Sequence, residues 1–294
     1  MNTGRSGVAV QAHARASGRD AGIRVAAVQM ISGPEVAPNL AKAGRLIAEA
    51  AAAGVQLVAL PEYFPLIGAT DADRLAAREV DGNGPIQAFL ARTARQHGLW
   101  LVGGSIPLMA QDPAKLRNAC LVFDPQGRRV ARYDKIHLFG FNKGDEVYDE
   151  AATIERGDQV VAFDSPFGRI GLAICYDLRF PELFRAMAQL PDQLPNPVDL
   201  LVLPAAFTET TGRAHWELLL RARAVENQCY VLAAAQGGQH PNGRLTHGNS
   251  MVIDPWGEVL ARMDTGEGVV VGELNQQRLV DTRMSLPALR HRIL

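Results

Sequence analysis

Short stretches in which apolar residues alternate with small or polar residues recur along the whole chain, and this period of two is typical of β-strands. We expect strands at residues 23–29, 55–60, 99–105, 117–123, 129–134, 169–175, 199–203, 229–235, 249–253, 258–263 and 268–273. Apolar residues at helical spacing predict helices near residues 37–53, 84–97, 181–190 and 213–227. Helical stretches lie between strands in both halves of the sequence, which favours an α/β fold.

Two patterns of the first half recur in the second half in the same order. Residues 124–134 and 254–264 both read Asp-Pro-x-Gly-x-x-apolar-Ala-Arg-x-Asp, which suits a turn between paired strands because Pro fixes φ and Gly tolerates a positive φ. Residues 55–61 and 198–204 both read as a buried strand that stops at Leu-Pro. We therefore predict two similar halves, packed sheet to sheet as a four-layer α-β-β-α sandwich. Chance similarity between the segments is the alternative.

Cys175 stands at a junction that is typical of catalytic thiols. Alternation over residues 168–175 predicts a strand, and Asp177 and Pro181 suit a turn followed by the first turn of a helix. A thiol at this junction can face a pocket and feel the positive end of the helix dipole, which favours the thiolate. A lone cysteine is more commonly a buried structural residue, so the interpretation depends on what else the chain offers.

Glu62 and Lys135 are the groups that such a thiol would need. Glu62 follows Pro61 just beyond a predicted strand, at the sheet edge where the sites of α/β folds gather. Lys135 has mostly apolar neighbours in the sequence. A solvated loop glutamate and a lysine that snorkels from a strand edge are the alternatives. Together with Cys175 they form a chemical set of base, oxyanion-stabilising cation and nucleophile, which a cleft between the two halves can assemble.

Three segments carry a resemblance to a known family: Leu60-Pro-Glu-Tyr63, Tyr133-Asp-Lys-Ile-His137 and Ile174-Cys-Tyr-Asp-Leu-Arg-Phe-Pro-Glu182. In these segments, and over about residues 23–289, the chain resembles the nitrilase superfamily of carbon–nitrogen hydrolases. The resemblance implies the same four-layer fold and catalytic Glu62, Lys135 and Cys175. It also implies hydrolysis of a small amide through a cysteine-bound acyl group, without a cofactor.

The same segments look most like the branch that contains deaminated-glutathione amidase and the omega-amidases of 2-oxo acids. We therefore expect a small amide that bears a carboxylate as the substrate. Hydrolysis of N-carbamoyl amino acids or amines by the same mechanism is the alternative reaction, and a binding protein without catalysis is the alternative of a different class. One departure is Asn249, since relatives often read Gly-His-Ser where this chain reads Gly-Asn-Ser.

The resemblance also implies a second glutamate that holds the lysine. Glu150 matches its place, and Asp149 and Glu146 are the alternatives in the same weakly patterned segment. The backbone N–H of Tyr176, directly after the predicted nucleophile, is expected to donate to the oxyanion beside Lys135.

The predicted binding residues follow the two strands of the second half. Arg179 can bind a substrate carboxylate or bridge to Asp177 or Glu182, and Lys143 and Arg213 are further candidate cations. Phe207 and Thr208 follow the strand at 199–203 as Glu62 follows its own strand, so we expect them to line the pocket. Thr211 or Gly212 would then cap the next helix.

Composition narrows the range of partners. The 294 residues are 47% hydrophobic and 21% charged with a net charge of −1, so no nucleic-acid or membrane partner is expected. The histidines form no metal-binding pattern, and we expect no metal. Three widely spaced cysteines favour a reducing, cytoplasmic location. We expect residues 1–22, which are Arg-rich and acid-poor, to be a flexible tail or a transit peptide before a hydrolase domain at 23–294.

A homodimer is expected because relatives pair near the helix that follows the nucleophile. Four residues would give that helix an apolar stripe: Phe180, Leu183, Phe184 and Met187. The helix at 213–227 would join the interface. Burial of the stripe inside the monomer is the competing explanation.

Overall fold

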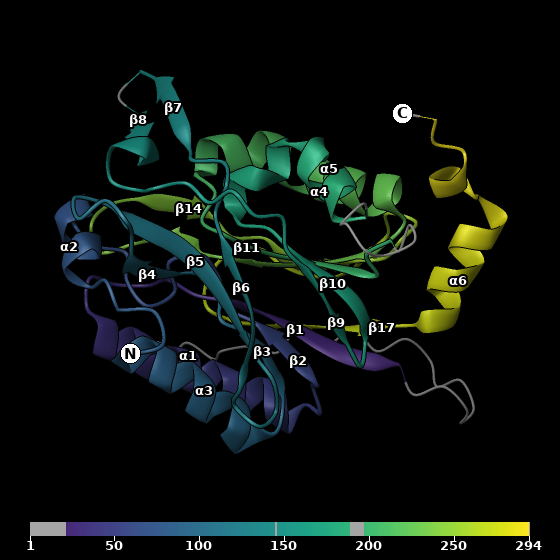
Figure 1. Cartoon of the computed structure of the whole chain (residues 1–294), viewed down its shortest axis with the longest axis horizontal. Helices are drawn as coiled ribbons and strands as arrows, with labels where there is room; N and C mark the ends of the chain where they lie inside the picture. Colours follow the sequence, from purple (N-terminus) through teal and green to yellow (C-terminus); the bar gives the residue numbers. More distant parts are fainter. Residues whose placement is uncertain (1–21, 145, 189–196, 294) are drawn as a thin grey trace, which may run out of the picture.

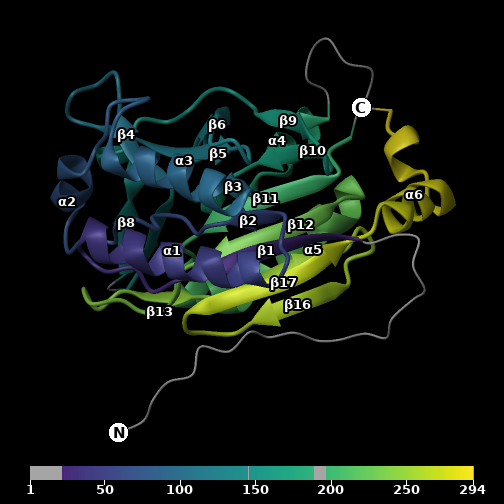
Figure 2. The ribbon, with the colours of Figure 1, turned by 90° about the horizontal axis from the view of Figure 1, so that it is seen from below.

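Two β-sheets lie face to face between two layers of helices in the computed structural model, which describes residues 22–144, 146–188 and 197–293 (Figure 1). Within these residues the first sheet has seven strands in the order β17-β1-β2-β3-β5-β4, with β6 paired to β5. The strands are β1 (Ile23–Gln29), β2 (Leu57–Ala59), β3 (Trp100–Val102), β4 (Ile106–Met109), β5 (Leu116–Phe123), β6 (Arg129–Asp134) and β17 (Gly268–Leu274). Figure 2 shows α1 (Val36–Ala52) and α3 (Pro85–His97) across its outer face.

The second sheet has six strands among the described residues, in the order β16-β15-β12-β11-β10-β9. These are β9 (Ala162–Ser165), β10 (Gly168–Leu172), β11 (Leu200–Ala205), β12 (Tyr230–Ala235), β15 (Ser250–Ile253) and β16 (Val259–Met263). On its outer face lie α4 (Pro181–Met187) and α5 (Glu209–Asn227) (Figure 1). The predicted α-β-β-α sandwich is confirmed.

Smaller elements complete the described chain. Two short hairpins are formed by β7 (Gly140–Lys143) with β8 (Glu146–Asp149), and by β13 (Gly237–Gln239) with β14 (Leu245–His247). The remaining helices are α2 (Asp71–Ala76), α6 (Gln276–Ser285) and the 3₁₀ turns η1 (Glu150–Ala152), η2 (Cys175–Arg179) and η3 (Ala288–Arg290). No helix in the described part of the chain is both long and apolar enough to cross a membrane.

The alternation of side chains along β1 explains the layers. Val25 and Ala27 point into the core between the sheets, where they join residues of the second sheet such as Leu200. Ala26 and Val28 point the other way, into the core beneath the helices of the first sheet. Because both faces of the strand are buried, all four residues are apolar rather than alternating with polar ones.

The two repeated patterns have different outcomes. The Asp-Pro-x-Gly turns are confirmed, since Asp124 and Asp254 each accept bonds from the backbone N–H groups two and four residues later, at 2.8–2.9 Å. The prediction that both Leu-Pro pairs stop a strand is wrong for the second pair. β11 continues through Pro204, which lies opposite Ala234 of β12. On the other side, β10 pairs only as far as Val202, so the missing N–H of Pro204 disturbs no ladder bond.

The last strand departs from the division into two halves. β17 is late in the sequence, yet it pairs antiparallel with the whole of β1 in the first sheet, from Ile23 opposite Leu274 to Gln29 opposite Gly268. The chain thus returns from the second sheet to the first. Its two halves are joined by backbone hydrogen bonds as well as by side-chain packing.

Two expectations about helices are also corrected. α5 begins at Glu209 rather than near residue 213, because the Thr208 hydroxyl accepts a bond from the Thr211 backbone N–H and caps the helix. The apolar stripe predicted after Cys175 faces inward: Leu183, Phe184 and Met187 are all buried in the core. The homodimer itself stays a prediction. The predicted tail lies outside the described residues apart from Gly22.

Candidate active site

The site is built where one strand of each sheet ends. Glu62 follows β2, and Cys175 follows β10 and opens η2. Tyr63 and Cys175 both have a positive φ, 53° and 50°, a region that non-glycine residues seldom occupy and that costs free energy. The turn after β2 is held by the Tyr63 N–H, which donates to Ser105 Oγ at 3.0 Å, and by Gln236, which donates to the Glu62 carbonyl at 3.0 Å. Sharp turns therefore aim both side chains out of their strands.

Asp177 links the turn that carries Cys175 to the segment that carries Lys135. Its carboxylate is fully buried and accepts bonds from the Tyr133 hydroxyl at 2.7 Å and from the Ile174 N–H at 2.8 Å. It also accepts a bond from the His137 N–H at 3.1 Å and lies 2.7 Å from His137 Nδ1. Because these partners flank Cys175 on one segment and Lys135 on the other, Asp177 fixes the distance between the two.

Lys135 lies between two carboxylates. Its Nζ donates to Glu62 Oε1 at 2.9 Å and to Glu150 Oε2 at 2.8 Å, and its side chain has no exposed surface. Burial alone would lower the pKa of Lys135, but the Glu150 and Glu62 charges outweigh burial and hold that pKa well above its usual value. The lysine is therefore a permanent cation, and two of its three N–H groups are used in these bonds.

Glu150, the predicted second glutamate, accepts a bond from Lys135. Beyond Lys135, it accepts bonds from the Tyr63 hydroxyl and from the Phe139 N–H, both at 2.7 Å. Burial would raise the pKa of Glu150, yet Lys135 and these donors lower it below its usual value. The alternative Asp149 is exposed and instead accepts a bond from the Ala151 N–H. The side chain of Glu146 lies outside the described part of the structure.

Glu62 has one occupied and one available oxygen. Oε1 accepts bonds from both Lys135 and Asn118 Nδ2, each at 2.9 Å. The Cys175 thiol lines the same pocket as the Glu62 carboxylate, and the charge of Glu62 raises its pKa. Since the other donors in the described residues converge on Oε1, Oε2 is left for the thiol proton. Asn118 was not predicted, although a lone buried amide in the apolar strand 117–123 was a signal for it.

The thiol itself is protonated at rest. Burial raises the pKa of Cys175 well above its usual value, and the Glu62 charge raises it further, against the opposing effects of Lys135 and the Ala206 N–H. The expected thiolate at a helix N-terminus is therefore wrong. The helix that follows is a five-residue 3₁₀ turn, and its dipole does not compensate for removal of the thiol from water.

A narrow pocket opens onto this cluster. It is lined by predicted residues, namely Glu62, Glu150, Cys175, Tyr176, Arg179, Phe207 and Thr208, and by residues that were not predicted, namely Phe139, Ala206, Thr211 and Arg244. Lys135 has no exposed side-chain surface and is not among the residues that line the pocket. Asn249 lies outside this wall, and its carbonyl accepts a bond from Trp216 Nε1 at 2.8 Å.

Arg179 lies against aromatic rings on the pocket wall. Its guanidinium carbon is 5.8 Å from the Tyr176 ring centre and 5.5 Å from that of Phe207, and Nη1 lies 3.3 Å from Nδ1 of His215. The described structure pairs it with no carboxylate, so the predicted bridges to Asp177 or Glu182 are wrong. Its charge is available to a ligand in the pocket.

The two reserve cations lie elsewhere. Lys143 is exposed on β7, and Arg213 forms an exposed ion pair with Glu209 on α5. The unpredicted cation on the wall is Arg244, which follows β13 in a polar loop. A basic residue in such a loop is ordinarily a solvated one, so nothing in the local sequence indicated it.

The resting protonation of Cys175 generates a prediction about pH. Because its pKa is raised, the difference in absorbance at 240 nm between the wild type and Cys175→Ala is expected to stay absent at pH 7 and to develop only above about 8.5, the usual thiol value. Glu62→Gln removes a charge that opposes ionisation, so the same titration is expected at lower pH. A thiolate signal already present in the wild type at pH 6 to 7 would contradict this reading.

Comparison with known proteins places these features in a family. Residues 24–284 match the model of the carbon–nitrogen hydrolase family. The deaminated glutathione amidase of Synechocystis is 40% identical to this chain, and the match covers 91% of this chain and 97% of the amidase. The human omega-amidase NIT2 is 38% identical, and the match covers 92% of this chain and 94% of NIT2. The crystal structure of Saccharomyces cerevisiae Nit3, a member of branch 10 of the nitrilase superfamily, superimposes with a TM-score of 0.82. Its sequence is 29% identical, and the match covers 95% of this chain and 100% of the Nit3 chain.

Proposed function

Because this chain belongs to the carbon–nitrogen hydrolase family, we propose that it is a thiol amidase in which Cys175 is the nucleophile. The observation that carries the proposal is the buried cluster of Lys135 with Glu62 and Glu150, which adjoins a thiol on the wall of a pocket. Such a cluster supplies a base and a fixed positive charge at the same point.

The first half of the reaction uses the free oxygen of Glu62. Sγ of Cys175 attacks the amide carbon while Glu62 takes the thiol proton, so a C–S bond forms as the carbonyl becomes an oxyanion. The third N–H of Lys135 and the backbone N–H of Tyr176 stabilise that charge. When the oxyanion collapses, the C–N bond breaks and Glu62 passes its proton to the departing amine.

The second half returns the enzyme to its resting state. Glu62, again a carboxylate, removes a proton from water, whose oxygen attacks the thioester carbon. The C–S bond then breaks, the carboxylic acid leaves, and the thiol recovers its proton from Glu62. Glu150 acts as a positioning residue, because its bonds to Lys135, Tyr63 and Phe139 hold the ammonium in place throughout.

The proposed substrate is a small amide that carries a carboxylate, such as deaminated glutathione or the omega-amide of a 2-oxo acid. The names of the related amidases support this class. So does the pocket, in which Arg179 offers a guanidinium without a carboxylate partner in the described chain, next to the apolar ring of Phe207. Thr208, occupied in capping α5, contributes to the wall.

We also propose a cytoplasmic homodimer. Cys120, Cys175 and Cys229 are all free thiols, which fits a reducing compartment.

Since the predicted stripe is buried, the second copy would cover other apolar residues, and Leu218 and Val225 are exposed on α5. Sedimentation at micromolar concentration should show a species of twice the monomer mass. A species of 31.7 kDa alone would contradict the dimer.

The nucleophile can be tested against the other two cysteines. Cys175→Ala is expected to abolish hydrolysis of 2-oxoglutaramate, since no other group can carry the acyl intermediate. Cys120→Ala and Cys229→Ala are matched controls, because both thiols are buried in the apolar core, where burial raises their pKa values. They should lower thermal stability and keep turnover. Retained turnover in Cys175→Ala would exclude the mechanism.

The role of Arg179 can be tested by substrate charge. Arg179→Leu is expected to raise KM for 2-oxoglutaramate about 10- to 150-fold, the effect of losing a charge-assisted bidentate contact of ~1.5–3 kcal/mol. A neutral amide of equal length should be affected far less. The steady-state kinetics of the two substrates, with an N-carbamoyl amino acid as a third, provide the measurement. Equal losses on both amides would mean that Arg179 only supports the wall.

A further inference from the structure

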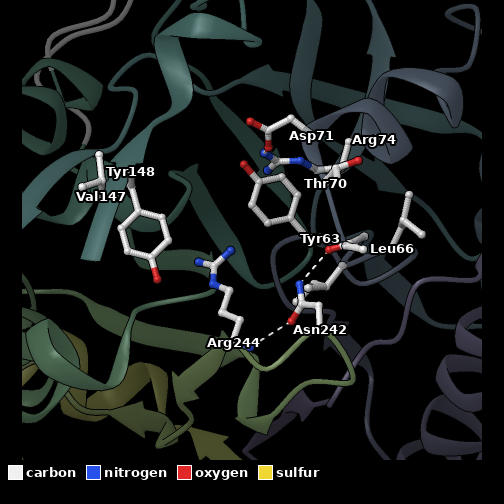
Figure 3. A pocket seen from close by; sticks show the side chains of 12 residues that line it. Tyr63, Leu66, Thr70, Asp71, Arg74, Val147, Tyr148, Asn242 and Arg244 are labelled. Carbon is white, nitrogen blue, oxygen red and sulfur yellow. Dashed lines mark hydrogen bonds and ion pairs between the residues drawn. The ribbon is translucent and has the colours of Figure 1, made fainter. Parts of the chain in front are cut away.

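Tyr63 lies between the lysine cluster and a second cavity. The cavity has a volume of about 360 Å³ and is lined in part by Tyr63 and Arg74. Figure 3 shows the Tyr63 side chain on its wall, with Arg74 and Asp71 beside the ring. Neither Tyr63 nor Arg74 is among the residues that line the catalytic pocket. Any effect of Tyr63 on the reaction therefore has to pass through another group.

The group that Tyr63 contacts in the cluster is Glu150. The Tyr63 hydroxyl donates to Glu150 Oε1 at 2.7 Å, whereas Oε2 accepts the bonds from Lys135 at 2.8 Å and from the Phe139 N–H at 2.7 Å. Burial and the Glu150 charge raise the pKa of Tyr63 well above its usual value, against the opposing effects of Arg74 and Lys135, so the hydroxyl keeps its proton for this bond. Because each oxygen of Glu150 has its own donor, the carboxylate cannot rotate without breaking a bond.

Arg74 holds the Tyr63 ring from the side of the cavity. Its guanidinium carbon lies 4.8 Å from the ring centre, and the guanidinium also pairs with Asp71, which stands three residues earlier on α2. The Arg74 side chain is only 14% exposed, and a cation over an aromatic ring is held more strongly when it is partly removed from water. The ring of Tyr63 is thus fixed on one side by Arg74, and its hydroxyl is fixed by Glu150.

The backbone of Tyr63 is a second, independent observation. Its φ of 53° lies in the left-handed region, where a bulky side chain is an outlier and glycine fits at little cost. The sharp turn after β2 accounts for this conformation, but it does not account for a tyrosine at the position. Strained residues of this kind gather at functional sites, and here the strain accompanies a side chain that reaches the lysine cluster.

Resting on the proposed function, we propose that Tyr63 is a positioning residue that acts on the reaction through Glu150, and that Arg74 holds Tyr63 in place for this role. By fixing one oxygen of Glu150, Tyr63 sets the direction of the bond between the other oxygen and Lys135. The remaining N–H of Lys135 is then directed at the oxyanion. Since Tyr63 does not line the catalytic pocket, its hydroxyl contributes to kcat and not to substrate binding.

Removal of one hydroxyl tests the proposal. Tyr63→Phe keeps the ring and is expected to lower kcat for 2-oxoglutaramate about 10- to 100-fold, the effect of losing a hydrogen bond to a charged group, with KM unchanged. Tyr230→Phe is the matched control, because Tyr230 is also buried and its hydroxyl also forms hydrogen bonds, to the backbone of Asn275 far from the cluster. The control should lower the unfolding temperature and keep kcat.

A double-mutant cycle tests the part assigned to Arg74. Arg74→Met should lower kcat about 2- to 10-fold in the wild type, because the ring loses its cation. In the Tyr63→Phe background the same substitution should cause no further loss of kcat, since the hydroxyl that Arg74 holds in place is already absent. An equal loss in both backgrounds would overturn the role given to Arg74.

The outcomes separate this inference from the proposed function. Unchanged kcat in Tyr63→Phe, with only a lower unfolding temperature, would make Tyr63 a structural residue and overturn the inference, while the proposed function stands. A raised KM with unchanged kcat would make Tyr63 a substrate contact and overturn the inference too. Failure of the wild type to hydrolyse 2-oxoglutaramate would overturn the proposed function together with the inference.

Discussion

The ammonium of Lys135, enclosed between two carboxylates, is the interaction on which the site depends. A fully buried lysine is stable only when its charge is paired, and here Glu62 and Glu150 supply the pair from two other segments. The cluster holds one cation and two carboxylates beside the thiol. Their balance keeps Lys135 charged and, with burial, keeps Cys175 protonated. In the proposed mechanism, proton transfer to Glu62 is then a required part of attack, since Cys175 holds its proton beforehand.

The fold provides this cluster because both sheets end their strands at one place. Glu62 and Lys135 come from the first sheet and its following segment, and Cys175 comes from the second. Asp177 links the last two through buried hydrogen bonds to Tyr133 and Ile174. The pairing of β17 with β1 then fixes the sheets against each other. Positions within the cluster are therefore set by the main chain of both halves rather than by flexible loops.

The sequence allowed prediction of those parts of the site that depend on local chemistry. Cys175, Glu62 and Lys135 each stand at a strand end with recognisable neighbours, and the structure brings them together. The sequence left Asp149 and Glu146 as alternatives to Glu150, because their segment has little pattern. Contacts with Tyr63 and Phe139, which are distant in the sequence, are what place Glu150 beside Lys135. The layers followed from alternation and repeats, whereas the crossing of β17 did not, because pairing between distant strands leaves no local mark.

What could not be predicted depends on contacts between distant segments. The raised pKa of Cys175 arises from burial and from Glu62, which lies 113 residues away in the chain. The residues next to Cys175 in the sequence indicated only the start of a helix, whose dipole would lower that pKa. Arg244 similarly acquires its place from Ala206 and Tyr148. Short elements such as α2, β4 and the β7–β8 hairpin were missed because few residues carry their pattern.

In the proposed mechanism the acyl group of the amide is transferred to Cys175 before water attacks. Partitioning with hydroxylamine tests this most directly, since hydroxylamine competes with water for a thioester and yields a hydroxamate. Two amides that share the 2-oxoglutaryl group but release different amines should give one common acyl-enzyme. The account predicts the same ratio of hydroxamate to acid from 2-oxoglutaramate and from the 2-oxoglutaryl amide of glycylglycine at each hydroxylamine concentration. A ratio that depends on the departing amine, or turnover without any hydroxamate, would contradict it.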